Sequence, residues 1–209
     1  MKIKKAENGC YFIKKGMTSV IGDKGVLLPV TVLERMKNAI LGQKNDRSLC
    51  VFSGYYGRFN KPEIGTLSKY TEDFPKKGFL KEIKLSDPKS EIALDLFTEG
   101  AFVDVSAITK GHGFQGGVKR YGFKGGRASH GCSLAHRTIG STGCRHLPSK
   151  TIKGRRMPGH MGCVLRTQQN LKVFRLENNY DALLVVGSVP GPKHGLVFVK
   201  KAVKKCDVK

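Results

Sequence analysis

A long stretch without a single carboxylate dominates this sequence and limits what it can fold into. No Asp or Glu occurs between Asp104 and Glu177, whereas Lys, Arg and Gly recur throughout that interval and most of the histidines lie in it. From Lys110 to Arg166 the apolar residues follow neither a period of 3.6 nor a period of 2, so no long helix or half-buried strand is expected there. Too few apolar side chains are present to offset the entropy of ordering this part of the chain. We therefore expect residues 110–166, called the basic segment below, to form an extended arm that becomes ordered on an anionic partner.

The charge balance of the whole chain also indicates an anionic partner. Its 209 residues include 38 Lys and Arg against 16 Asp and Glu, which gives a formal net charge of +22. Charges of one sign repel each other in a compact domain, so an excess of this size indicates binding rather than stability. No apolar run approaches the ~20 residues that span a bilayer, and the first residues lack the apolar core of a secretory signal. We expect no membrane partner, and we expect the six cysteines to be reduced thiols in a cytosolic compartment.

Both flanks of the basic segment contain short runs typical of strands, separated by Gly- and Pro-containing turns, and FLKEIKLS alternates apolar and charged residues as a half-buried strand does. The strands are expected at residues 11–21, 26–33, 48–54, 79–85 and 101–108, and later in NLKVFRLE, ALLVVGSV and GLVFVKKAV. A turn at residues 22–25 joins the first two strands, and ENNYD forms the hairpin turn between the first two of the late ones. One short helix is expected within residues 61–74, with Pro62 in its first turn.

These elements predict a mainly β fold in which both ends of the chain build one β-barrel. Residues 1–109 and 167–209 supply the barrel strands, a small mixed insertion lies near residues 55–98, and the basic segment leaves the barrel between two strands.

The basic segment begins with a Gly-x-Gly-x-x-Gly pattern at Gly111, Gly113 and Gly116. In a dinucleotide-binding fold this pattern leads into a helix whose amino terminus faces the pyrophosphate, and an acidic residue follows about 20 positions later. Four further glycines up to position 126 argue against a helix here, and the next acidic residue is Glu177. No dinucleotide or other cofactor is therefore expected.

The histidines and cysteines of the basic segment lack the spacing of a zinc module, because no Cys-x-x-Cys pair occurs. Ser133 lies near His130 and His136, but no carboxylate is close in sequence to orient either imidazole, and Asp104 is distant. We expect no metal, no catalytic residue and no small-molecule substrate. Two alternatives stay open: an RNA-processing enzyme with His130 or His136 as general acid or base, and a free basic RNA chaperone.

Nucleic acid is the partner that suits this composition best. Lys and Arg at short intervals neutralise successive phosphates and release counterions, and aromatic faces among them stack on unpaired bases. RNA is favoured over duplex DNA because the sequence offers no recognition helix or zinc finger for a major groove. The expected contacts are Lys110, Phe114, Lys119, Arg120, Tyr121, Phe123, Lys124, Arg127, His130, His136, Arg137, Arg145, His146, Lys150, Lys153, Arg155, Arg156, His160 and Arg166.

Several long motifs in order resemble one family. The run GHGFQGGVKRYGFKGGRASHGCSLAHRTIGSTG, followed by KGRRMPGHMG, is similar to the arm of large-subunit ribosomal protein three in its bacterial form. The opening IKKGMTSVIGDKGVLLPVTVLE and the late NLKVFRLENNYDALLVVGSVPGPKHG resemble its first and last strands. The resemblance covers the chain from about Cys10 to Lys204.

This resemblance implies a fold and a function that residue patterns alone do not reach. The fold is a closed six-stranded barrel of the translation-protein type. The function is that of a structural component of the large ribosomal subunit, which binds 23S-type rRNA, helps to nucleate assembly and directs its arm toward the peptidyl-transferase region. Neighbouring large-subunit proteins are partners, and the location is the cytoplasmic ribosome, with an organellar ribosome as the alternative. Ser129 and Ser133 join the expected rRNA contacts as part of the most motif-like stretch.

The chain departs from the family pattern at residues 144–149. Many bacterial relatives have Gln-Asn-Gln-x-Pro-Gly where this chain has Cys-Arg-His-Leu-Pro-Ser. His146 replaces a glutamine that is methylated in some relatives, so that modification is not expected here. Ser149 stands at the position of the closing glycine.

Overall fold

The computed structural model describes residues 9–22, 25–44, 47–54, 57–70, 75–83, 97–144, 146–177 and 181–205. Within them it contains eleven strands and two short helices, so the predicted mainly β fold is confirmed. The chain divides into two compact units, one of Met1–Ile108 with Leu165–Lys209 and one of Thr109–Val164.

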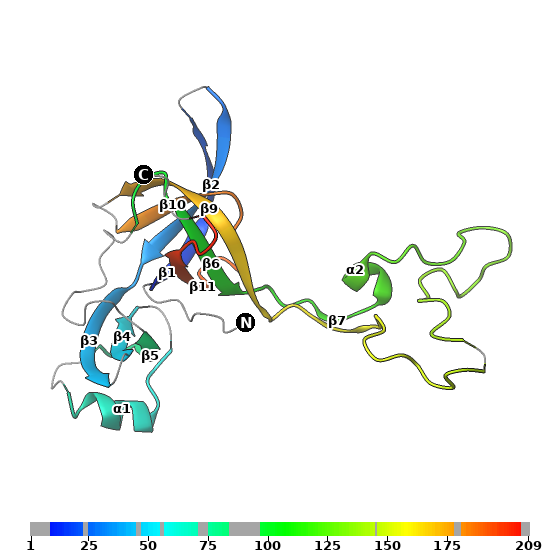
Figure 1. Cartoon of the computed structure of the whole chain (residues 1–209), viewed down its shortest axis with the longest axis horizontal. Helices are drawn as coiled ribbons and strands as arrows, with labels where there is room; N and C mark the ends of the chain where they lie inside the picture. The colour runs from blue at the N-terminus through cyan, green and yellow to red at the C-terminus, as the bar shows by residue number, and fades with distance from the viewer. Residues whose placement is uncertain are drawn as a thin grey trace. The chain divides into compact units, whose positions relative to one another are not determined.

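The first unit is built around six antiparallel strands that close into a barrel (Figure 1). Each strand pairs with the next in the order β1, β11, β6, β9, β10 and β2, and β2 pairs again with β1. The strands are β1 (Gly9–Ile21), β2 (Leu27–Arg35), β6 (Phe102–Ile108), β9 (Leu165–Glu177), β10 (Ala182–Val186) and β11 (Leu196–Lys201). Strands from both ends of the sequence therefore share one sheet, as the recurring strand-like runs on both flanks predicted.

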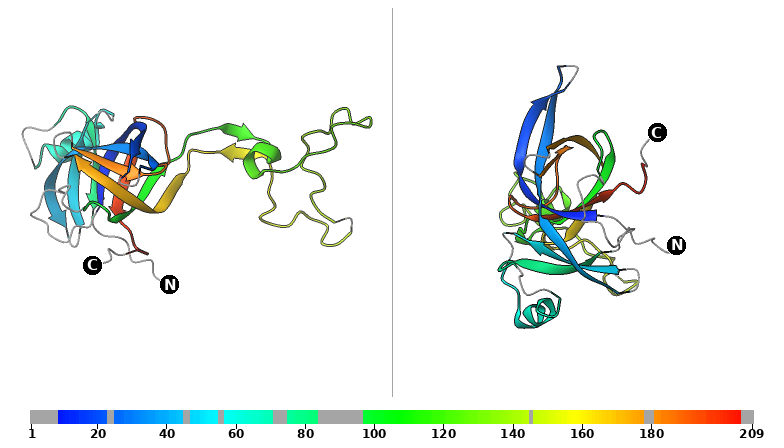
Figure 2. Two further views of the ribbon diagram at one scale, coloured as in Figure 1. Left: turned by 90° about the horizontal axis from the view of Figure 1, so that it is seen from above. Right: turned by 90° about the vertical axis from the view of Figure 1, so that its left-hand side faces the viewer.

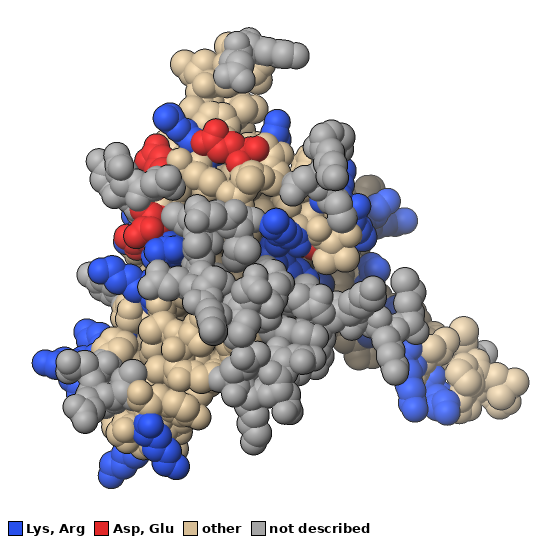
Figure 3. Space-filling view, turned by 60° about the vertical axis from the view of Figure 1, so that its left-hand side comes forward, with Lys and Arg blue, Asp and Glu red and all other residues tan. Residues whose placement is uncertain are grey.

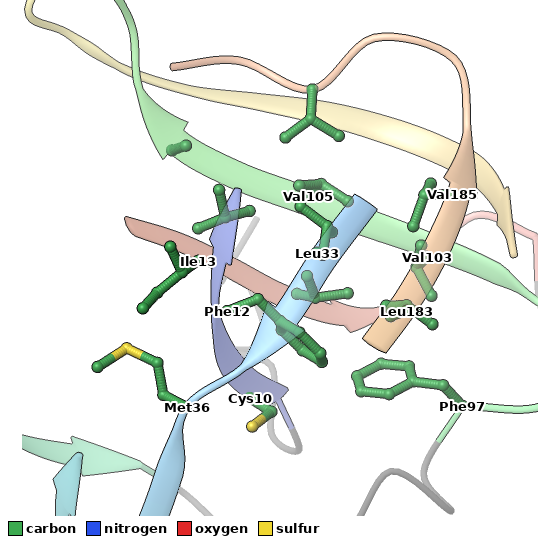
Figure 4. Packing of buried hydrophobic residues seen from close by; sticks show 14 of the residues in the cluster. Cys10, Phe12, Ile13, Leu33, Met36, Phe97, Val103, Val105, Leu183 and Val185 are labelled. Atoms are coloured by element: carbon green, nitrogen blue, oxygen red, sulfur yellow. The ribbon is translucent and has the colours of Figure 1, made fainter. Parts of the chain in front are cut away.

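Apolar side chains from the barrel strands fill the inside of the barrel. In β6, Val103, Val105 and Ala107 are buried at 1%, 0% and 3% exposure, whereas Ser106 and Ile108 are not buried. Phe12 and Phe97 meet in the interior with ring centroids 6.0 Å apart, beside Leu33 and Leu183 (Figure 4). Fully burying one such side chain contributes roughly 1.5–3 kcal/mol, so this interior supplies the main stabilisation of the unit.

One carboxylate is buried in the barrel wall, where it satisfies backbone donors. Asp104 is 2% exposed, and its two oxygens accept hydrogen bonds from the N–H groups of Asn170 at 3.0 Å and Val203 at 3.4 Å. The pairing register between β6 and β9 shifts at this point, and Asn170 has a positive φ of 56°. Asp104 thus stabilises the irregular stretch of β9 at Asn170 and also binds the chain at Val203, just after β11.

The β1–β2 hairpin continues beyond the strands that flank it. β11 pairs with β1 only over residues 9–13 and β10 pairs with β2 only over residues 30–34, while β1 and β2 pair with each other as far as Ile21 and Leu27. This ribbon projects from the barrel in the right-hand view of Figure 2, and its described atoms carry no charged side chain in Figure 3. Met17, Ile21 and Leu27 are more than half exposed on it.

A second, three-stranded sheet corrects the predicted boundaries of the insertion. Its strands are β3 (Lys37–Lys44), β4 (Arg47–Ser53) and β5 (Gly78–Ile83), in the order β3-β4-β5. The insertion was expected near residues 55–98 with the strand at 48–54 in the barrel, which is wrong, because β4 pairs with β3 and β5. β3 was not expected at all, since KNAILGQK has no alternating pattern and few β-branched residues.

Each face of this small sheet packs against apolar residues of the same unit. On one face Phe52 and Phe79 stack at 5.2 Å, and Phe52 meets Tyr11 of β1 edge-on at 4.9 Å. On the other face Val51 packs with Leu67 of helix α1 (Lys61–Leu67). Asn60 precedes α1, and its N–H donates to the carboxylate of Glu63 at 2.8 Å. Pro62 lies in the first turn as predicted.

The remaining strand predictions are confirmed to within about two residues at most ends, and β9 begins earlier than NLKVFRLE indicated. Residues 71–74 of the predicted helix, and residues 178–180 of the predicted turn ENNYD, lie outside the described residues. In the part of the chain that the structure describes, no helix is long and apolar enough to cross a membrane.

Candidate nucleic-acid interface

The unit of Thr109–Val164 begins and ends as a pair of antiparallel chain segments. The N–H of Thr109 donates to the carbonyl of Val164 at 3.0 Å, and the N–H of His112 donates to Met161 at 2.9 Å. Strands β7 (Gly113–Gln115) and β8 (Gly159–Met161) follow and pair with each other. No strand was expected here, because three residues are too few to show a period of 2.

A glycine makes the close approach of these two segments possible. Gly162 has a φ of +84°, and a Cβ atom on it would lie 2.0 Å from the carbonyl oxygen of Lys110. Any other residue at this position would therefore push the two segments apart. Its backbone would also have to adopt a positive φ, which L-residues rarely do.

A short helix, α2 (Gly117–Tyr121), follows β7 and corrects the prediction that glycines prevent helix formation here. The glycines bound the helix instead of breaking it: Gly116 is its N-cap, and Gly122 ends it in the left-handed conformation with a φ of 73°. A strand therefore does lead into a helix at the third glycine of Gly-x-Gly-x-x-Gly. The helix has only five residues, and the acidic residue that would bind a ribose is still missing from the sequence.

Side chains beside α2 pack into a small cluster of their own. Gly117 is the only buried residue among the described residues of this unit, and the side chains of Ile139 and Phe123 lie within 3 Å of where its Cβ would be. The rings of Tyr121 and Phe123 are 6.0 Å apart. Phe114, in contrast, is 76% exposed. The three aromatic side chains expected to stack on bases therefore differ in how freely they can do so.

Two arginines meet the ring of Tyr121. The guanidinium carbon of Arg120 lies 5.0 Å from the ring centroid, and that of Arg156 lies 5.6 Å from it. Arg120 also donates from Nη1 to the carbonyl of Met157 at 2.7 Å. These contacts join α2 to a stretch of chain more than thirty positions later, which no short-range sequence pattern could have indicated.

The loop that carries the serine-histidine motif is closed by contacts of His136. The N–H of Gly126 donates to the carbonyl of His136 at 2.9 Å, and Nδ1 of His136 lies 2.9 Å from the carbonyl of Arg127. An Nδ1–H donates to that carbonyl, so this nitrogen of His136 has a structural role. Ser129, His130 and Ser133 lie on the exposed loop between these contacts.

The basic side chains of the candidate interface are accessible. Arg145 lies outside the described residues, Arg166 lies on β9 in the first unit, and Arg120 is half-buried. The others are exposed: Lys110, Lys119, Lys124, Arg127, Arg137, Lys150, Lys153, Arg155, Arg156, and the histidines His130, His136, His146 and His160. Because the sequence has no carboxylate between Asp104 and Glu177, none of these cations has an acidic partner within the Thr109–Val164 unit.

The ligand types in this region do not gather into a metal site. Among the described residues, no group of three or more His, Cys, Asp or Glu side chains has the proximity that a metal ion requires. Cys144 and Cys163 are exposed as thiols.

Comparison with known proteins identifies the family. The family model described as Ribosomal protein L3 matches residues 81–182. The protein named Large ribosomal subunit protein uL3 of Hydrogenovibrio crunogenus is 40% identical over 211 residues, covering 94% of this chain and 99% of that protein. Its namesakes in Rickettsia typhi and Rickettsia prowazekii are each 38% identical, covering 93% of this chain and 95% of theirs. The chain belongs to the ribosomal protein L3 family.

The resemblance drawn from the sequence motifs is thereby confirmed. The L3 family model spans the whole Thr109–Val164 unit as well as β6 and β9 on either side of it.

The structure also describes a point where this L3-family chain departs from the expected motif. Ser149, where the family resemblance predicts a closing glycine, adopts a φ of 58°, within the left-handed region that glycine favours. Its Oγ donates to the carbonyl of His146 at 2.5 Å. Further along, Arg155 donates from Nη2 to the carbonyl of Ser141. Ser149 thus adopts a backbone conformation typical of glycine, and the hydrogen bond from its own hydroxyl group to His146 stabilises the turn.

Proposed function

We propose that this chain is a structural constituent of the large ribosomal subunit that binds 23S-type rRNA through its basic segment, helps to nucleate subunit assembly and directs that segment toward the peptidyl-transferase region. The observation that carries the proposal is the combination of exposed Lys and Arg side chains on Thr109–Val164 with the complete lack of carboxylates in that interval. Close relatives of similar length bear the name of a large-subunit protein, which supports the same assignment.

Binding in this account is mainly electrostatic. Each Lys or Arg that meets a phosphate displaces condensed counterions, so the logarithm of the affinity falls linearly with the logarithm of salt concentration, by roughly 0.7–0.9 per phosphate contact. The loop carrying Ser129, His130 and Ser133 supplies hydrogen-bond donors for phosphate and ribose oxygens. Arg166, near the start of β9, is a further rRNA contact in this proposal.

The barrel has a separate role in this proposal. It is a barrel of the translation-protein type that presents the basic segment from β6 and β9, and its outer surface contacts neighbouring large-subunit proteins. The cytoplasmic ribosome is its location. Residues 110–166 form the rRNA-binding arm, and residues 1–109 with 167–209 form the barrel and its small insertion.

A salt titration of rRNA binding tests the proposal. Wild-type protein is titrated with a 23S-type rRNA fragment at several salt concentrations, beside a variant that lacks three exposed cations, K124A/R127A/R137A. A control variant of equal charge, K61A/K69A/K76A, removes exposed lysines of the barrel unit. We expect the first variant to reduce the slope by roughly 2–3 and the control to change it less. Equal slopes in all three proteins would contradict the assignment of the basic segment as the contact surface.

A further inference from the structure

Arg120 differs from the other cations of the basic segment in its surroundings. It is half-buried, whereas Lys119 and Lys124 on either side are exposed. Its Nη1 donates to the carbonyl of Met157 at 2.7 Å, and the same nitrogen lies 2.6 Å from where a Cβ on Gly159 would stand. The guanidinium therefore lies close against the backbone of residues 157–159, where only a glycine leaves it room.

The same guanidinium forms one half of a stack on Tyr121. Arg120 lies 5.0 Å from the ring centroid and Arg156 lies 5.6 Å from it. Contacts between a guanidinium and an aromatic face are favourable, and a planar guanidinium makes such a contact while it donates hydrogen bonds in its own plane. Arg120, Tyr121 and Arg156, called the arginine clamp below, thus join helix α2 to the returning chain at residues 156–159.

We propose that Arg120 is a positioning residue, which holds α2 against residues 156–159 so that the cations on both segments meet rRNA in a fixed arrangement. This inference rests on the proposed function. Lys119 and Lys124 lie on or beside α2, and Lys153 and Arg155 lie beside the returning chain. Strands β7 and β8 already place Gln115 opposite Gly159, and the clamp adds a second attachment beyond them. Without the clamp these two groups of cations would move more freely, and they would lose more conformational entropy on binding.

Arginine is required at position 120 by the geometry rather than by the charge. A lysine keeps the positive charge and still reaches a phosphate, but it has neither the planar face that stacks on Tyr121 nor the fixed direction of the donor toward Met157. The substitution Arg120→Lys therefore separates a positioning residue from a simple phosphate contact.

The test compares R120K and R120A with R127K and R127A in the same salt titration of rRNA binding. Arg127 is exposed and directly follows Gly126, so it provides the matched phosphate contact. For Arg120 we expect both variants to weaken binding by a similar factor, about 5- to 30-fold, with the wild-type salt slope retained. For Arg127 we expect the lysine variant to keep the wild-type salt slope and to weaken binding less than R120K does, and the alanine variant to lower the slope by roughly 0.7–0.9.

A second readout, on the free protein, reports the clamp directly. The ring signals of Tyr121 in a tyrosine-labelled sample are assigned by comparison with Y121F. We expect R120K and R120A to shift these signals and R127K to leave them unchanged. The inference is overturned if R120K binds rRNA like wild type while R120A lowers the slope, or if the Tyr121 signals do not respond to R120K. If wild-type affinity itself does not depend on salt, the proposed function fails, which is a separate outcome.

Discussion

The Nζ atom of Lys14 donates a hydrogen bond of 2.7 Å to the carbonyl of Val189, 175 positions away in the sequence. The same ammonium lies 3.2 Å from the carbonyl of Gly191, and the N–H of His194 donates to the carbonyl of Lys14 at 2.7 Å. Lys14 lies on β1 and is 9% exposed. Its ammonium group is bound by carbonyls of the loop that follows β10. A buried ammonium thus stabilises the Gly-Ser-Val-Pro-Gly stretch at residues 187–191, which follows β10.

Replacing Lys14 should destabilise the barrel. The substitution Lys14→Met keeps the length of the side chain but leaves the carbonyl of Val189 buried without its donor, and we expect a loss of about 1–3 kcal/mol in the free energy of unfolding. Urea unfolding measures it. Lys15→Met is the matched control, because Lys15 pairs with Glu34 at 2.7 Å on the surface, where both side chains are 40% exposed. We expect that control to change stability by less than about 1 kcal/mol, and equal losses would contradict the role of Lys14.

Asp104 should prove structural rather than catalytic. Asp104→Ala removes the acceptor for the N–H groups of Asn170 and Val203, so we expect the thermal midpoint to fall, with a loss of about 1–3 kcal/mol. Glu99→Ala is the control, since Glu99 accepts a single bond from the N–H of Leu176 in an exposed position. A stable D104A protein that had lost rRNA binding would contradict this role.

The buried and the exposed cysteine thiols should differ in their reactivity. Burial raises the pKa of the Cys10 thiol from 9.0 to about 12 and that of Cys50 from 9.0 to about 11. We expect iodoacetamide at about pH 8 to label Cys144 and Cys163 quickly and to reach Cys10 and Cys50 only after unfolding, because the thiolate is the reactive form. Mass spectrometry of the peptides reads this out. Fast labelling of Cys10 in the folded protein would contradict its place in the barrel interior.

The raised pKa of the Cys10 thiol also makes the stability of the fold depend on pH. The folded pKa of Cys10 lies above its unfolded value, so the neutral thiol stabilises the fold below about pH 9, and this contribution is lost as the pH rises toward 12. Cys10→Ala should therefore reduce the fall in stability between about pH 9 and pH 11, measured as the urea midpoint. A fall as steep as that of wild type would show that other groups cause it.

Phe114 and Phe123 should behave differently when they are shortened to alanine. Phe114 is 76% exposed, so F114A should leave thermal stability unchanged and weaken rRNA binding by about 1–3 kcal/mol if its ring stacks on a base. Phe123 packs beside Gly117 and Ile139, so F123A should alter the signals of the α2 region in the free protein. Identical behaviour of the two variants would contradict the distinction between a stacking ring and a packing ring.

The barrel strands could be predicted because their inward residues recur at every second position, as Val103, Val105 and Ala107 do in β6. β3 lacked that signal, and a register shift between Ile40 and Gly42 interrupts it further. Helix α2 was missed because propensity treats glycine as a breaker, whereas Gly116 and Gly122 act as caps at its two ends. The arginine clamp depends on a return of the chain from Arg120 to Arg156, which no local pattern contains. That the rest of the basic segment becomes ordered only on rRNA stays a prediction.

Co-sedimentation tests the central claim most directly. Tagged wild-type protein and K124A/R127A/R137A, expressed at equal levels, are followed through sucrose gradients of native extract at high salt, which removes loosely bound basic proteins. We expect the wild-type protein to migrate entirely with the large subunit and the variant to be depleted from it. Wild-type protein that remained at the top of the gradient, free of the large subunit, would contradict the account.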